Sequence, residues 1–67
     1  MTEYHIIGFA GNEDAILHET YTFKQARQWV ADYTRTCWGG WDGIRIDAFG
    51  EDMNEPVEYF YPPEQED

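Results

Sequence analysis

The chain has 67 residues, and 14 acidic against 4 basic side chains give it a formal net charge of −10. This length fits one domain, because domains run from about 50 to 250 residues. The acidity argues against direct binding of DNA or RNA, since contacts to phosphate rely on Lys and Arg. It also argues against docking on anionic lipid. We therefore expect a small protein whose partner is basic.

The aromatic content argues against disorder. Phe, Trp and Tyr make up 18% of the chain and hydrophobic residues 42%, whereas disordered acidic chains contain few aromatic residues. Cys37 is the single cysteine, so no internal disulfide is expected, and no zinc spacing such as C-x2-C is present. The sequence shows neither a signal-peptide pattern nor an apolar stretch long enough to span a membrane. We expect a cytoplasmic protein.

The first two predicted strands form a hairpin. Residues 4–10 (YHIIGFA) are rich in β-branched and aromatic side chains, and residues 11–14 (GNED) are a turn cluster. A second strand is predicted over residues 15–21 (AILHETY). The spacing indicates an antiparallel pair joined by a four-residue loop.

Thr22 is the predicted N-cap of a helix, and Gln25 three residues later completes a capping-box pattern. Apolar side chains then recur at a helical spacing that predicts one buried stripe over about four turns. The stripe contains Phe23, Ala26, Trp29, Val30 and Tyr33, and it extends to Cys37. Trp29 and Tyr33 are predicted to lie in the core. Glycines 39, 40 and 43 follow, and they do not continue a helix at low cost.

Two more strands are predicted after the helix. Residues 44–49 (IRIDAF) alternate, with Ile44, Ile46 and Ala48 pointing inward, and residues 50–55 form a turn. Pro56 opens a last strand over residues 57–61, which should pair with the strand before it. We predict an α+β fold, in which an antiparallel sheet of order β-β-α-β-β carries one amphipathic helix on one face. The domain covers residues 1–61, and residues 62–67 form an acidic, flexible tail.

The acidic charge is unevenly distributed. Residues 23–36 carry three bases and one acid, so the remainder of the chain has a balance of −12. Residues 51–67 contain seven acids and no base. Such clustering costs stability through self-repulsion, and a functional reading is that carboxylates imitate DNA, whose duplex carries one charge per about 1.7 Å. Solubility and adaptation to high salt are the alternative explanations.

No catalytic or metal-binding motif is found in the sequence. Cys37 has no nucleophile motif around it, and a cysteine that ends an apolar stripe is typically a small buried hydrophobe. His18-Glu19 lacks the second histidine of an HExxH helix. The Gly39-Gly40 segment follows a helix and contains no lysine, which argues against a phosphate loop. We expect no enzyme activity, no metal, no cofactor and no small-molecule substrate.

The last two strands combine acids with aromatic side chains. If Val57, Tyr59 and Tyr61 face one side, then Glu58 and Phe60 face the other, beside Arg45, Asp47 and Phe49. Aromatic anchors within a charged surface are typical of protein-binding patches. The residues expected to contact a partner are five acids and two aromatic anchors: Asp47, Glu51, Asp52, Glu55, Glu58, Trp41 and Phe60.

In length, acidity and order of predicted elements, the chain resembles small phage-encoded inhibitors, in particular anti-CRISPR proteins that act on type I systems. The resemblance implies a DNA mimic or steric block that occupies a basic, nucleic-acid-binding surface of a CRISPR effector subunit. It carries no shared motif, so the contact residues above rest on the charge pattern alone. The alternatives are a generic protein-interaction module that uses exposed aromatics, such as a complex subunit, and a small protein adapted to high salt.

Overall fold

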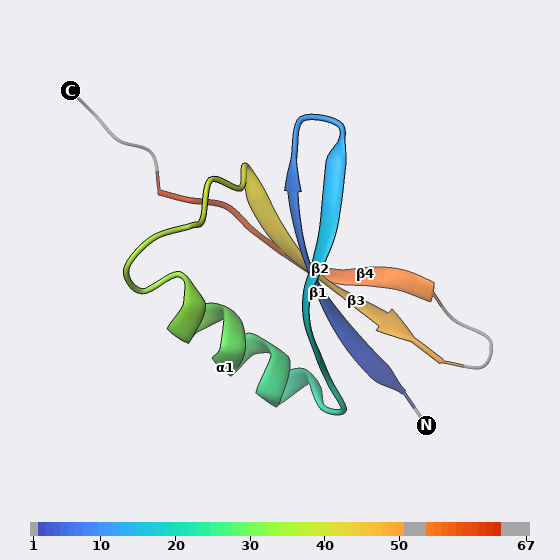
Figure 1. Cartoon of the computed structure of the whole chain (residues 1–67). Coiled ribbons are helices and arrows are strands. Elements are labelled where there is room, and N and C mark those ends of the chain that lie inside the picture. The colour runs from blue at the N-terminus through green and yellow to red at the C-terminus, as the bar shows by residue number, and fades with distance from the viewer. Residues whose placement is uncertain (1, 51–53, 64–67) are drawn as a thin grey trace.

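Four antiparallel strands form one sheet, and a single helix packs on one of its faces (Figure 1). The computed structural model describes residues 2–50 and 54–63. In chain order the elements are β1 (Glu3–Ala10), β2 (Glu13–Thr20), α1 (Phe23–Tyr33), β3 (Gly43–Phe49) and β4 (Asn54–Phe60). Their order in the sheet is β2-β1-β3-β4. The helix α1 therefore connects the edge strand β2 to β3, which lies on the other side of β1. The predicted α+β fold and the pairing of the last two strands are confirmed.

The β1–β2 hairpin has a two-residue turn, not the four-residue loop expected from the sequence. Ala10 pairs with Glu13, which leaves Gly11 and Asn12 as the turn. Gly11 has a φ of +60°, and a glycine with positive φ at the first central position is the pattern of a type II′ turn. Because this turn matches the twist of the strands, pairing continues to the tip, and Glu13 and Asp14 belong to β2.

The register of β4 reverses the faces expected for its side chains. Ile44 pairs with Phe60 and Ile46 with Glu58, whereas Arg45 pairs with Tyr59. Phe60 and Glu58 therefore lie on the helix side of the sheet, and the prediction that they lie beside Arg45, Asp47 and Phe49 was wrong. A strand's register is set by its partner across the turn, so alternation within 57–61 alone could not determine it.

The helix begins as predicted and ends earlier than predicted. The Thr22 Oγ1 accepts a hydrogen bond from the Gln25 backbone N–H at 3.1 Å, which is the expected N-cap contact. Tyr33 is the last helical residue, and the Thr34 hydroxyl donates to the Val30 carbonyl at 2.8 Å. The helix is thus 11 residues long, about three turns. Cys37 lies outside it and is exposed, so its predicted burial was wrong.

The core lies between α1 and the two inner strands, β1 and β3. Its buried side chains are Ile6, Ala26, Val30, Ile44 and Ile46. Burial of an isoleucine or valine stabilises the fold by roughly 1.5–3 kcal/mol. The inward orientation predicted for Ile44, Ile46 and Ala48 is confirmed.

Trp29 and Tyr33, predicted to lie in the core, pack against its edge. Both are half-buried, and their rings stack with centroids 4.8 Å apart. The His18 ring stacks on the other side of Trp29 at 5.1 Å. In the part of the chain that the structure describes, no helix has the length and apolar character needed to cross a membrane.

Candidate protein-binding surface

The face of the sheet opposite α1 is called the open face here, because none of the described elements packs on it. The pairing of the strands places its side chains in rows across the sheet. One row runs Glu19, His5, Asp47, the next Ile16, Ile7, Arg45, Tyr59, and a third Asp14, Phe9, Gly43. The open face therefore combines charged and aromatic side chains drawn from all four strands.

Arg45 binds acids of two strands, β2 and β3, at the centre of the open face. Its Nε donates to both carboxylate oxygens of Asp47, at 3.0 and 3.2 Å, and its terminal nitrogen donates to Asp14 at 3.3 Å. Asp14 is on β2 and Arg45 on β3, with β1 between them, so the Arg45 side chain must cross β1. Ile7 lies in that row and is only 7% exposed, which fits an arginine whose apolar stem passes over β1.

Asp47 is a buried partner of this network and is only 6% exposed. Burial by itself lowers the pKa of Arg45, but the charges and hydrogen bonds of Asp47 and Asp14 outweigh it, so that pKa is raised above its ordinary value. Arg45 is therefore charged at every pH at which a folded protein is studied. The negative charge of Asp47 is used inside the protein and is not presented to a partner.

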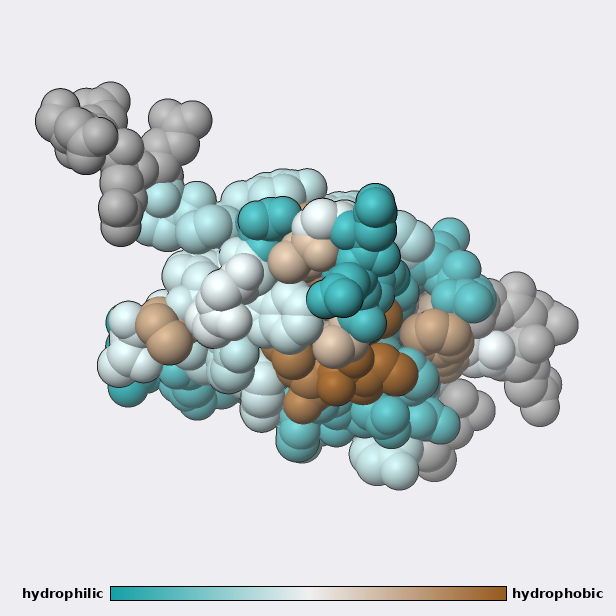
Figure 2. All heavy atoms as spheres, turned by 45° about the horizontal axis from the view of Figure 1, so that its top comes forward, coloured by the Kyte–Doolittle hydropathy of each residue, from teal (hydrophilic) through white to brown (hydrophobic). Residues whose placement is uncertain are grey.

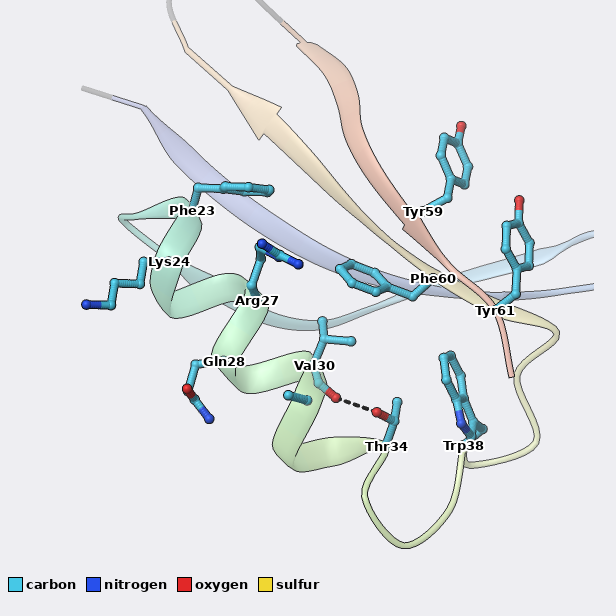
Figure 3. A pocket seen from close by; sticks show the side chains of 11 residues that line it. Phe23, Lys24, Arg27, Gln28, Val30, Thr34, Trp38, Tyr59, Phe60 and Tyr61 are labelled. Carbon is cyan, nitrogen blue, oxygen red and sulfur yellow. Dashed lines mark hydrogen bonds between the residues drawn. The ribbon is translucent and has the colours of Figure 1, made fainter. Parts of the chain in front are cut away.

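Three aromatic rings, which we call the aromatic cluster, lie at the end of the open face where β1 and β4 end. Tyr59 and Tyr61 stack with their centroids 6.3 Å apart, and the Phe9 ring meets them edge-on at 6.3 and 6.1 Å. Tyr59 is 50% exposed and Tyr61 62%. Figure 3 shows the two tyrosines extending away from α1, whereas Phe60 between them points toward the helix. This aromatic cluster has the residue types that anchor protein interfaces.

Two further apolar side chains are exposed, one on each edge strand of the sheet. Ile16 is 58% exposed, and Val57, the extra residue at the bulge in β4, is 43% exposed. Figure 2 shows that the strongly hydrophobic surface on the side in view is gathered in one main area bordered by hydrophilic residues. Such a rimmed apolar area is a feature of interaction surfaces.

The structure does not bring the expected contact acids together on one surface. Asp47 is buried on the open face, whereas Glu58, on the helix side, forms an ion pair with Arg27 at 3.3 Å. Glu55 pairs with Ala48 across the sheet and is exposed. Glu51 and Asp52 lie outside the described residues.

The two expected aromatic anchors support the helix side of the sheet. Trp41 packs on Gly8 so closely that a Cβ atom at Gly8 would lie 2.6 Å from the indole ring. Phe60 packs against the core. Both side chains are half-buried, so the exposed aromatic surface comes from Tyr59 and Tyr61.

The sequence reasoning missed the acids of the β1–β2 hairpin. Glu3, Glu13 and Glu19 are exposed, and within residues 2–50 and 54–63 none of them forms an ion pair with Lys or Arg. At the tip, the Asp42 carboxylate accepts a hydrogen bond from the Gly11 backbone N–H at 3.0 Å, which brings a further acid to the hairpin. The pairing of the hairpin places Glu19 opposite His5 and close to Glu3, and the four-residue loop expected from the sequence does not give this register.

A groove of about 790 Å³ runs between α1 and β4 on the helix side (Figure 3). It forms because α1 packs on β1, β2 and β3 and leaves the edge strand β4 uncovered. Phe23, Val30, Trp38 and Phe60 give it apolar walls, and Lys24 and Arg27 lie along its rim. The Arg27–Glu58 ion pair joins its two sides.

A scan against protein-family models finds no match for this chain, and searches of curated proteins and of solved structures find no match either.

Proposed function

We propose that the chain is a non-enzymatic binding protein that uses the open face and the acids of the β1–β2 hairpin to occupy a basic surface of a nucleic-acid-binding protein. Nucleic acid would then be kept from that surface. The partner class suggested by the resemblance to anti-CRISPR proteins is a type I CRISPR effector subunit in the cytoplasm of a bacterial host.

The pairing of the arginines is the observation that carries this proposal. Arg27 pairs with Glu58, Arg35 with Asp32 at 2.9 Å, and Arg45 with Asp14 and Asp47. All three arginines are thus paired with acids, and Lys24, on the helix side, is the one base without an ion pair within residues 2–50 and 54–63. The charge that the open face and the hairpin leave for a partner is therefore negative. A basic partner would be attracted over a distance, which raises the association rate and makes it fall with added salt.

The aromatic cluster supplies binding affinity that exposed charges alone do not provide. Exposed ion pairs contribute only about 0.2–1 kcal/mol each, so affinity needs anchors that lose water on binding. Tyr59 and Tyr61 lie on the same face as the row of Glu19 and His5. A partner that covers the open face would bury the tyrosines and meet the acids at the rim, which is the usual layout of an interface.

The proposal is tested by a mobility-shift assay with a purified type I effector complex and its labelled target duplex. Added protein is expected to release the DNA. The double variant Glu13→Gln with Glu19→Gln removes two exposed charges, and we expect it to require an about tenfold higher concentration, because two such charges contribute up to about 2 kcal/mol. Glu58 is left unchanged because its substitution would also break the ion pair with Arg27.

The matched control changes the net charge by the same two units at another place. Gln25→Lys with Thr36→Lys adds two charges at exposed positions in the helix and the turn after it, and this variant should inhibit like the unchanged protein. Equal loss in both double variants would show that the location of the charge does not matter. That result, or no release of DNA by the unchanged protein, contradicts the proposal.

The second candidate is a protein-interaction module that does not compete with nucleic acid. It is favoured by the exposure of Tyr59 and Tyr61 and by the internal pairing of Asp47 and Glu58. Replacing both tyrosines with serine would then abolish binding, and the Glu13→Gln and Glu19→Gln variant would bind as before.

A further inference from the structure

Three side chains with metal-binding atoms meet at the end of the open face that lies away from the aromatic cluster. His5 on β1 is paired with Glu19 on β2, and Glu3 lies two residues before His5 on the same face. One oxygen of each carboxylate and one His5 ring nitrogen all lie within 4.8 Å of one another. We propose that Glu3, His5 and Glu19 bind a divalent transition-metal ion of the zinc type, with water completing the coordination. This site differs from the expectation of no metal, and it does not rest on the proposed function, whose charge test at Glu19 is carried out without added metal because a bound cation would neutralise that carboxylate.

The spacing within the cluster suits a shared ion. The His5 Nε2 and the Glu3 Oε1 are 3.5 Å apart, which is longer than the roughly 2.7–3.2 Å of a well-formed N–H···O hydrogen bond. In tetrahedral zinc, bonds of about 2.1 Å place neighbouring ligand atoms about 3.4 Å apart. The observed separation therefore leaves room for an ion between the two atoms with little movement of either side chain.

The fold orients the histidine before any ion binds. The His5 ring stacks on Phe49 with centroids 4.2 Å apart, and its side chain is only 17% exposed. Strand pairing fixes the backbone of all three residues. A ligand held in this way loses little conformational freedom on binding, which favours affinity.

The charges at the site favour a divalent cation of this class. Two carboxylates and a neutral imidazole balance an ion of charge +2, and the net charge of −10 raises the local concentration of cations. Among the described residues, Arg45 is the one arginine or lysine on the open face, and it is engaged by Asp47 and Asp14. An imidazole ligand selects zinc-type ions over Ca²⁺ and Mg²⁺, which take oxygen ligands and more of them.

Isothermal titration of the protein with Zn²⁺ tests the site, with every variant made in a Cys37→Ser background, because the exposed Cys37 thiol is itself a zinc ligand. We expect one ion per chain. His5→Phe keeps an aromatic ring on Phe49 but removes the nitrogen, and Glu19→Gln keeps the shape of the side chain. Each should weaken binding at least about tenfold, the smallest effect seen even for residues that only support a metal ligand.

His18→Phe is the matched control, because His18 lies on the helix side, stacked on Trp29. It should bind Zn²⁺ like the background protein, and the imidazole NMR signals of His5 but not those of His18 should shift on titration. Circular dichroism confirms that each variant is folded. Absence of Zn²⁺ binding, equal binding by the His5→Phe variant, or equal affinity for Ca²⁺ would overturn the proposal.

Discussion

Asp47 illustrates, at the scale of single residues, how a charge that the sequence marks as a partner contact can serve the fold instead. It is buried and accepts two hydrogen bonds from the Arg45 Nε. Asp14 binds the same guanidinium, but its side chain is 54% exposed. Water can replace Asp14 at the arginine, whereas it has little access to Asp47. The two acids should therefore differ in their effect on stability.

We predict that Asp47→Asn lowers the free energy of unfolding by about 1–3 kcal/mol, because the Arg45 guanidinium then loses the charge of its buried partner. Asp14→Asn, the matched control at the exposed end of the network, should cost less than about 1 kcal/mol. Urea denaturation followed by circular dichroism measures both. Equal costs for the two variants would show that burial does not distinguish them.

The residue scale also shows why the expected site was predicted only in part. The acids around residues 51–58 were selected because they are close in sequence, but a turn and a strand distribute neighbouring residues over different faces. Glu58 faces α1 and pairs with Arg27. Glu3 and Glu19 are far apart in sequence, and the hairpin brings them together. Such a juxtaposition depends on strand register, which the local pattern does not contain.

At the scale of elements, the parts of the fold that depend on local chemistry were predictable. The Thr22 cap follows from a contact three residues away, and the inward side of β3 from the alternation of apolar and polar residues along the strand. The faces of β4 were not predictable from its own sequence, because they depend on its register with β3. Val57 is inserted as a bulge opposite β3, between the pairs Asp47–Pro56 and Ile46–Glu58, and one such residue reverses the side on which every later residue of the strand lies.

The helix start gives the prediction at this scale. Thr22→Ala removes the Oγ1 that accepts from the Gln25 N–H, and we expect a loss of about 1 kcal/mol in the free energy of unfolding. Thr36→Ala is the control, because Thr36 is exposed and lies beyond the end of α1. It should change stability by less than about 0.5 kcal/mol. A cost for Thr22→Ala as small as that of the control would contradict the role of the cap.

At the scale of the whole molecule, a small core must hold together a strongly charged chain. Five buried side chains form the core cluster, and a net charge of −10 acts against it. Four strands about 4.8 Å apart span only about 14 Å. The screening length is about 30 Å at 10 mM salt and about 8 Å at 0.15 M. In dilute buffer the acids of the sheet therefore repel one another across its whole width, and at physiological salt only close neighbours repel.

We predict that the protein is folded in 10 mM buffer and that its free energy of unfolding rises by about 1 kcal/mol, the scale of one exposed charge pair, as salt is raised to 0.15 M. The Glu13→Gln and Glu19→Gln variant carries two fewer charges, so its gain should be smaller. Circular dichroism in dilute buffer and urea titrations at each salt concentration measure these quantities. A protein that is unfolded in dilute buffer and folds only in molar salt would contradict this prediction and would instead support adaptation to high salt as the reason for the acidity.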